Sequence, residues 1–249
     1  MKKRNKYIGV ITLCIVVAII FLVTSAPTAI QTAGSPRSLP IYSVQRDDKC
    51  VSLTFDAAWG NEDTQQLIDI LGKYNVKATF FIVGDWAEKY PESVKSLYDA
   101  GHEVMSHSNH HDHYASLTTD QIIEDLNAAN ERISAVTGVT PKLIRCPYGE
   151  YDNHVIDAIR SIGMEPIQWD VDSLDWKDLS AADITKRVTG KVQPGSIVLF
   201  HNAAKHTPEA LPTIIEKLLQ EGYTFVPISE IILKGKYTID HTGRQCPAR

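Results

Sequence analysis

The chain has 249 residues, of which 43% are hydrophobic and 22% charged, and its formal net charge at pH 7 is -5. This composition is typical of a globular protein with one sizeable core. The mildly acidic balance gives no clustered basic face, so we expect no nucleic-acid partner.

The first 26 residues differ in composition from the rest of the chain. Four basic residues within 1–6 precede an uncharged apolar run over 7–26. A run of about 20 such residues can span a bilayer as a helix, and its basic flank should stay cytoplasmic. We therefore expect a cytoplasmic flank over 1–6 and a transmembrane signal-anchor over 7–26. The chain would cross the cell membrane once, and the rest of it would lie outside the cytoplasm.

A cleaved signal peptide is the alternative, because small residues at 24–26 end the apolar run. The protein would then be secreted. Pro27 and the length of the run favour the uncleaved anchor. Residues 27–41 are rich in Pro, Thr, Ala, Ser and Gly and are expected to form a flexible linker, followed by one catalytic domain over 42–249.

Cysteine spacing carries little information about function. Cys14 lies in the apolar run, which leaves Cys50, Cys146 and Cys246 in the domain, an odd number with no CxxC spacing. This pattern gives no metal-knuckle or redox motif. A bridge between Cys50 and Cys246 would join the two ends of the domain and is left open by the sequence.

In the domain, strand and helix patterns alternate about seven times. Strands are expected at 50–55, 78–83, 103–106, 143–145, 165–169, 196–200 and 224–227. Helices are expected at 63–74, 85–90, 91–100, 118–136, 152–162, 180–192, 211–220 and 229–233. Such alternation implies parallel strands with right-handed helical crossovers, as a barrel or an open doubly wound sheet.

The distribution of polar residues favours the barrel. No glycine-rich fingerprint follows the first strand, and polar clusters follow several different strands. In a barrel the carboxyl ends of many strands converge on one mouth. We therefore expect an α/β fold, a distorted (β/α) barrel with about seven parallel strands.

Four imidazoles and one carboxylate lie within residues 107–113, directly after the strand expected at 103–106. His107 and His111, four residues apart on one turn, can face the same point. Neutral imidazole is the commonest metal ligand in proteins. For this heptapeptide alone, a metal site and a solvated histidine-rich loop are equally compatible with the sequence.

Residues at other strand ends offer the remaining parts of a hydrolytic site. Asp56 is placed to take a proton from a water, and His201 is placed to give one to a leaving group. Arg145 would orient Asp56, and Asp175 would orient His201. Singly, each has a structural explanation, such as a turn cap, an ion pair or a core histidine. Five clusters in fixed order at five strand ends favour the hydrolytic interpretation.

Over about residues 51–233 the sequence resembles the polysaccharide deacetylases with the NodB homology domain, carbohydrate esterase family 4. The motifs that carry the resemblance are Thr-Phe-Asp at 54–56, His-Ser-x-x-His at 107–111, Arg-x-Pro-Tyr-Gly at 145–149, Asp-Ser-x-Asp-Trp at 172–176 and Leu-x-His at 199–201. The resemblance implies a distorted barrel and a metal-dependent polysaccharide N-deacetylase, a hydrolase of carbon–nitrogen bonds other than peptide bonds. The implied substrate is an N-acetylated amino-sugar glycan of peptidoglycan or the spore wall.

By that likeness Asp56 is the catalytic base, and His107 and His111 are the metal ligands. His201, tuned by Asp175, is the catalytic acid. The implied metal is a divalent ion, zinc with cobalt as the alternative. The expected partners are the wall glycan and the cytoplasmic membrane, and the protein is expected to be a monomer.

The same likeness assigns the remaining residues of the site. Arg145 orients the base, and Tyr148 gives its backbone N–H to the oxyanion. Trp176 and Leu199 wall the acetyl pocket, and Pro147 contributes to substrate binding.

One position departs from the family pattern. The first motif usually has a second aspartate as a metal ligand, and here that position is Ala57. The run from Asp56 to Gly60 in a membrane-anchored chain looks like the sporulation-associated branch of these enzymes. Two imidazoles alone should hold the metal weakly, unless Asp112 or extra water fills the third position. The alternative function is therefore a catalytically weak or inactive glycan-binding or scaffold protein of the spore envelope.

Overall fold

The structure is a computed structural model that describes residues 37–248. The anchor predicted over 7–26, together with its basic flank, lies outside the described residues. Within 37–248, no helix has both the length and the apolar character needed to cross a membrane.

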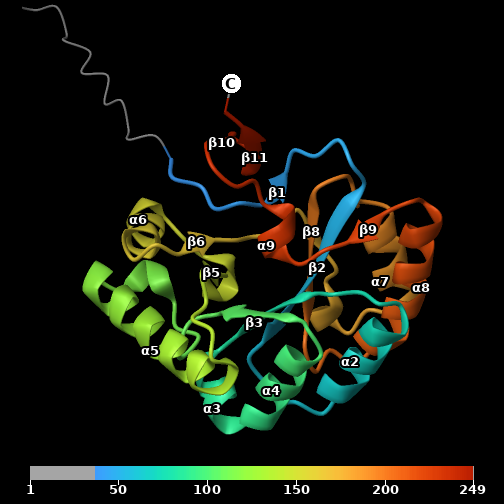
Figure 1. The fold of residues 1–249 in the computed structure, drawn as a ribbon, viewed down its shortest axis with the longest axis horizontal. Coiled ribbons are helices and arrows are strands. Elements are labelled where there is room, and N and C mark those ends of the chain that lie inside the picture. Colours follow the sequence, from blue (N-terminus) through green and yellow to red (C-terminus); the bar gives the residue numbers. More distant parts are fainter. Residues whose placement is uncertain (1–36, 249) are drawn as a thin grey trace, which may run out of the picture. The chain divides into compact units, whose positions relative to one another are not determined.

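One sheet organises this part of the chain (Figure 1). Its strands are β1 Ser43–Val44, β2 Cys50–Ala57, β3 Thr79–Ile82, β4 Glu103–Ser106, β5 Leu143–Ile144, β6 Glu165–Pro166, β7 Val171–Asp172, β8 Ser196–His201, β9 Thr224–Phe225, β10 Tyr237–Ile239 and β11 Arg244–Pro247. The strands β8, β2, β3, β4, β5 and β6 are neighbours in that order, and each pair is parallel. Strand β9 also pairs in parallel with β2, so the seven predicted strands and their parallel arrangement are confirmed.

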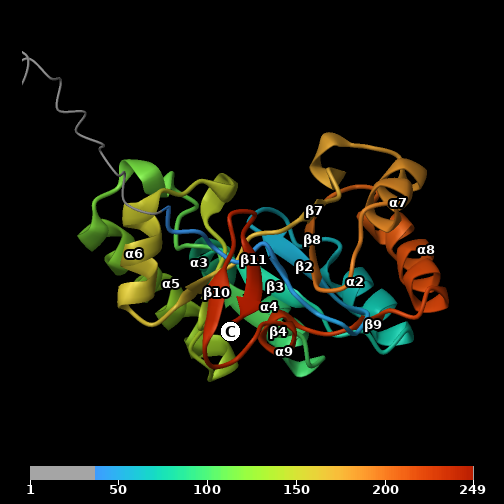
Figure 2. The same ribbon diagram turned by 90° about the horizontal axis from the view of Figure 1, so that it is seen from above.

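Helices surround the sheet, as two perpendicular views show (Figures 1 and 2). They are α2 Thr64–Lys73, α3 Gly84–Lys89, α4 Pro91–Asp99, α5 Thr119–Thr137, α6 Asn153–Ser161, α7 Ala181–Thr189, α8 Thr207–Gln220 and α9 Ile228–Ile231, with 3₁₀ turns η1 Tyr114–Ser116, η2 Pro147–Gly149 and η3 Asp175–Lys177. Helix α5 begins with a capping box between Thr118 and Gln121. Helix α8 begins four residues before its predicted start, because Pro208 in its first turn needs no hydrogen-bond partner for its nitrogen.

The sheet curls into a parallel-strand half-barrel, not a barrel closed by parallel strands alone. Between β6 and β8 the gap is spanned by the segment that begins at Ile41. The Ile41 N–H donates to the Pro166 carbonyl at 3.0 Å, and the Gln168 N–H donates to the Ile41 carbonyl at 2.7 Å. The next residues form β1, which runs antiparallel to β8. The short strand β6 thus meets an added segment of the chain at this edge.

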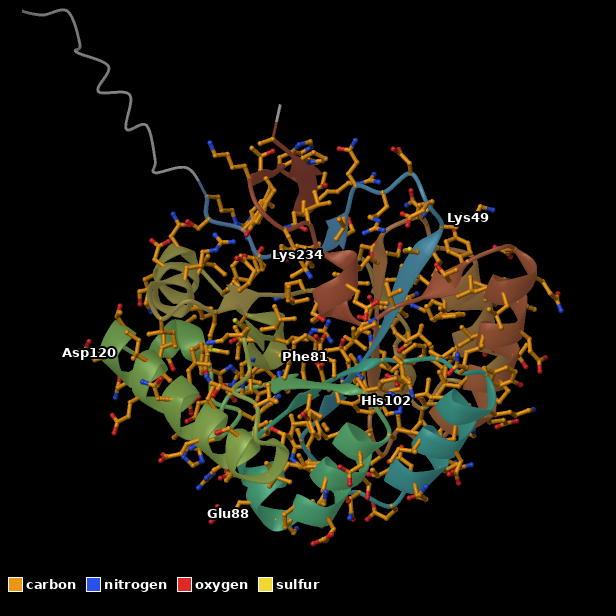
Figure 3. All side chains as sticks on the ribbon, in the orientation of Figure 1. Lys49, Phe81, Glu88, His102, Asp120 and Lys234 are labelled. Carbon is orange, nitrogen blue, oxygen red and sulfur yellow. The ribbon has the colours of Figure 1, made fainter. Side chains whose placement is uncertain are left out.

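Successive residues of each strand face opposite sides of the sheet. On β3, Phe80 packs in the core beneath the helices, where its ring stacks on Phe55 at a centroid distance of 4.8 Å. Phe81 belongs to a second cluster inside the curl. Figure 3 places Phe81 centrally and Glu88 and Asp120 on the outer side of the helices. The half-barrel therefore has an apolar layer on each face.

The carboxyl-terminal hairpin β10–β11 was not predicted. It extends the sheet, because β11 pairs in parallel with β1 (Figure 1). It also places Cys246 on β11, between β10 and β1. The bridge to Cys50 is not formed, since Cys50, Cys146 and Cys246 are all free thiols.

Candidate active site

The carboxyl ends of the parallel strands place the predicted clusters on one edge of the sheet. Asp56 near the end of β2 and His201 at the end of β8 are register partners on neighbouring strands. His107 follows β4 and Arg145 follows β5, and the Arg145 N–H donates to the Ser106 carbonyl at 3.0 Å. Residues up to 145 positions apart in the chain are therefore brought to one place by strand order.

A cavity of about 440 Å³ opens at this edge. Its lining residues are Asp56, Ala58, Trp59, His107, His111, Tyr148, Gly149, Trp169, Asp172, Trp176, Leu199, His201 and Asn202. Each of the five predicted clusters contributes at least one residue. The convergence expected from a parallel-strand fold is thus observed.

Three predicted site residues do not line the cavity. Arg145 and Asp175 are buried behind it, where they contact Asp56 and His201 respectively. Pro147 is buried at the start of η2. The first two act through a neighbour, while the structure shows no direct access of Pro147 to the cavity.

Arg145 fixes the carboxylate of Asp56. Its guanidinium donates to Asp56 Oδ1 at 2.7 Å, to Thr54 Oγ1 at 2.8 Å and to the Gln168 carbonyl at 3.0 Å. Burial by itself would raise the pKa of Asp56, but the charge of Arg145 and two nearby imidazoles bring that pKa below its ordinary value. Asp56 is therefore ionised and able to accept a proton.

The pKa of His201 is shifted in the opposite direction. Its Nδ1 lies 2.8 Å from Asp175 Oδ1, and Asp175 Oδ2 accepts from the His201 N–H and from the Thr207 hydroxyl. Burial would lower the pKa of His201, but the hydrogen bond and charge of Asp175 raise it above the ordinary value. One cavity thus holds an ionised carboxylate and an imidazole whose proton is bound more tightly than usual, which is the arrangement of a base and an acid.

The loop after β4 curls so that two imidazoles meet. Ser108 and His111 have φ values of 73° and 60°, a left-handed conformation that few non-glycine residues adopt. Ser108 Oγ accepts from the His111 N–H at 2.8 Å, and the Asn109 N–H donates to Asp125 Oδ1 at 2.8 Å. The rings of His107 and His111 lie edge to face with centroids 4.9 Å apart.

These two rings suit a divalent cation. His107 Nδ1 lies 2.7 Å from the Arg145 carbonyl, so the neutral ring donates there and keeps the lone pair of Nε2. Burial lowers the pKa of His107, and burial together with His107 lowers that of His111 to about 4, so both rings are neutral at pH 7. With zinc–nitrogen bonds of about 2.0–2.1 Å, two rings on a tetrahedral ion would have centroids about 5 Å apart. His111 Nδ1 is buried and has no hydrogen-bond partner among the described residues.

Neither Ala57 nor Asp112 supplies the third ligand beside the two imidazoles. Ala57 packs with Phe55 in the core beneath the helices, on the face of β2 opposite Asp56, and is absent from the described lining of the cavity. Asp112 is exposed and is also absent from that lining. Across residues 37–248, no three His, Cys, Asp or Glu side chains form a group that could hold a metal. The imidazole pair fits a cation but lacks one protein ligand.

Several lining residues were not assigned a role from the sequence: Ala58, Trp59, Gly149, Trp169, Asp172 and Asn202. Trp59 and Trp169 lie within clusters that the sequence already marked as strand ends. A tryptophan three residues after the strand-end carboxylate Asp56 is the signal that could have identified Trp59.

Comparisons with known proteins agree with this geometry. Residues 43–167 match the family model described as polysaccharide deacetylase. The chain is 34% identical over 193 residues to the uncharacterized protein YlxY of Bacillus subtilis, covering 78% of this chain and 60% of YlxY. It is 35% identical over 190 residues to a peptidoglycan-N-acetylglucosamine deacetylase of Bacillus cereus, covering 75% of this chain and 69% of that protein.

A solved structure with a similar fold is BA3943 of Bacillus anthracis, described as a CE4 family pseudoenzyme. It has a TM-score of 0.75 and 37% identity over 77% of this chain and 68% of its own. A mutant of BA3943, described as having restored enzymatic activity, has the same TM-score at 38% identity over 77% of this chain and 70% of its own. Proteins similar to this chain thus include one named as a deacetylase and one described as a pseudoenzyme.

Proposed function

The chain belongs to the polysaccharide deacetylase family, and from that membership we propose that it hydrolyses acetyl groups from an N-acetylated amino-sugar glycan of peptidoglycan or the spore wall. The observation that carries this proposal is the pairing of Asp56 and His201. Their pKa values are shifted in opposite directions in one cavity, which also contains the His107 and His111 imidazoles.

His107 and His111 would hold zinc, or cobalt, and would hold it weakly because the position of the third family ligand is Ala57. When bound, the metal would polarise the acetyl carbonyl and lower the pKa of a water. Asp56 would take the proton from that water. Arg145 holds one oxygen of Asp56, while the other, Oδ2, lies 3.6 Å from His107 Nε2 and is the oxygen that would accept the proton.

His201 would give a proton to the departing amine, and Asp175 is its positioning residue. Tyr148 is the second residue of η2 and has a φ of 58°, and a backbone N–H in the first turn of a helix has no partner within it. That N–H would donate to the oxyanion. Trp176 and Leu199, both in the cavity lining, would enclose the acetyl methyl group.

A catalytically weak or inactive glycan-binding or scaffold protein is the second candidate. It is favoured by a specific observation, which is that Ala57 faces the core and no carboxylate takes its place among the described residues. The similarity to a protein described as a pseudoenzyme points the same way. Both candidates require a glycan in the cavity, so turnover is what separates them.

Acetate release decides between these candidates. The chain is incubated with acetylated chito-oligomers and with peptidoglycan, without metal and with added zinc or cobalt. We expect acetate only with metal, and none from the variant His201→Ala. Absence of acetate under every metal, with glycan binding retained, would establish the second candidate.

We also propose that residues 7–26 anchor the protein at the outer face of the cytoplasmic membrane of a spore-forming bacterium. The length and apolar character of that run, and Pro27 at the point of potential cleavage, support this location. Membrane fractionation with amino-terminal sequencing tests it. A mature protein found free in the medium and beginning after Ala26 would contradict it.

A further inference from the structure

Three large hydrophobic side chains that line the cavity remain exposed: Trp59 at 65%, Trp176 at 59% and Tyr148 at 54%. Exposed aromatic side chains gathered at one place mark a binding surface. Trp176 and Tyr148 belong to motifs that the proposed reaction already uses. Trp59, the most exposed of the three, has no part in it.

The loop that carries Trp59 is held by contacts that do not involve its indole. Asn202 Nδ2 donates to the carbonyls of Trp59 at 2.6 Å and Gly60 at 2.8 Å, and Trp86 Nε1 donates to the Gly60 carbonyl at 2.5 Å. Gly60 has a φ of 61°, and a Cβ there would lie 2.5 Å from Glu62 Oε2. The backbone is therefore fixed without the indole, which can be presented to a ligand at little cost in conformational entropy.

The indole lies beside the imidazole pair, at the rim. Its ring contacts His111 edge to face with a centroid distance of 5.0 Å, and His111 in turn contacts Tyr148 at 4.5 Å. A part of the ligand that packs on the outer face of the Trp59 indole therefore lies next to the part that enters the cavity. This position suits the neighbouring unit of a polymeric ligand and not the unit that reacts in the cavity.

We propose that Trp59 is a substrate-recognition residue that stacks on the sugar adjacent to the one whose acetyl group is removed. The C–H groups of a sugar face carry partial positive charge and pack on the negative face of an aromatic ring. No lysine or arginine is among the described residues that line the cavity, whereas Asp56 and Asp172 are. A neutral oligomer of N-acetylglucosamine therefore fits better than an anionic glycan, and this inference rests on the substrate class of the proposed function.

Calorimetric titration of the full-length chain with N-acetylglucosamine, its dimer and its tetramer tests the role of Trp59. We expect Trp59→Ala to weaken tetramer binding about tenfold and to change monomer binding less than about twofold. Trp59→Phe should retain most of the affinity for the tetramer. Tyr98→Ala is the matched control, because Tyr98 is an exposed aromatic residue on α4 that lies outside the cavity lining.

The outcomes separate this inference from the proposed function. If the parent binds the tetramer and Trp59→Ala binds it equally well, the role of Trp59 is wrong and the proposed function stands. Equal losses for monomer and tetramer would place the indole at the reacting sugar and would also overturn the inference. If the parent binds none of the three sugars, both the inference and the proposed substrate class fail.

Discussion

Arg145 and Asp56 form an ion pair that is almost completely withdrawn from solvent, with Nη1 and Oδ1 2.7 Å apart and side chains that are 0% and 7% exposed. The pair joins the strand ends of β5 and β2. Removal of one partner from such a pair leaves an uncompensated buried charge. The pair therefore links the stability of the domain to the charge state of the base.

Arg145→Met should lower the free energy of unfolding by about 3–5 kcal/mol, because Asp56 loses its compensating charge. Chemical denaturation measures this loss. Arg132→Met is the control, since Arg132 pairs with Asp85 and Glu88 at the surface and its removal should cost about 1 kcal/mol or less. Equal losses for the two variants would contradict the structural role given to Arg145.

Asp175→Asn should lower the pKa of His201. In the parent, Asp175 raises that pKa against the opposing effect of burial, so without its charge the imidazole loses its proton at lower pH. NMR titration of the imidazole measures the shift, and the alkaline limb of acetate release should move to lower pH with it. Thr207→Val keeps the carboxylate and serves as the control. An unchanged His201 pKa in Asp175→Asn would show that another group sets it.

Acid should destabilise the domain through His102. Burial, with a smaller effect of Lys77, lowers the pKa of His102 to about 4, and its Nδ1 accepts the Ala78 N–H. In the unfolded chain the His102 imidazole binds a proton below about pH 6.5, whereas in the folded chain it binds one only below about pH 4. The free energy of unfolding therefore falls between these two pH values and does not change through this group above them. The full contribution is about 3 kcal/mol.

Urea denaturation at pH 7.5 and pH 4.5 measures this acid effect. His102→Gln should show a smaller difference between the two pH values than the parent does. An identical difference in both proteins would mean that other groups, with His111 the first to examine, carry the acid sensitivity.

Zinc binding should depend on two of the four clustered histidines. His107→Ala and His111→Ala should each abolish binding in a calorimetric titration, because each removes one of the two imidazoles that meet in the cavity. His110→Ala and His113→Ala are matched controls from the same loop, whose rings are largely exposed and pair with Asp85 and Glu150. Equal zinc binding by all four variants would show that the loop is not a metal site.

Much of the fold could be predicted because apolar periodicity is a local property. The seven parallel strands and their helices follow from it. The contact of Ile41 with Ile167, which spans the open edge, joins residues far apart in the chain and leaves no local pattern. Strands β1 and β7, of two residues each, were missed for the same reason. The hairpin β10–β11 pairs locally, but its strands of three and four residues are too short to show a clear apolar alternation.

The sequence predicted which residues come together in the site, because parallel strands end on one edge of the sheet. It did not predict the conformation or the exposure of each side chain. The left-handed conformations of Ser108 and His111 depend on hydrogen bonds within the folded loop. The exposure of Trp59 depends on contacts from Asn202 and Trp86, which lie far from it in sequence.

A calorimetric zinc titration of the parent and Ala57→Asp, with Ala57→Asn as the neutral control, shows whether the imidazole pair is a metal site that lacks one ligand. Ala57 faces the core, so the added carboxylate reaches the imidazoles only if the end of β2 turns toward the cavity, as Ala58 already does. We expect Ala57→Asp to bind zinc about tenfold more tightly or better, since it adds a charged ligand, and to release acetate faster than the parent. If Ala57→Asp binds zinc no more tightly and releases acetate no faster than Ala57→Asn, the result contradicts the proposal that His107 and His111 hold a metal that lacks one protein ligand.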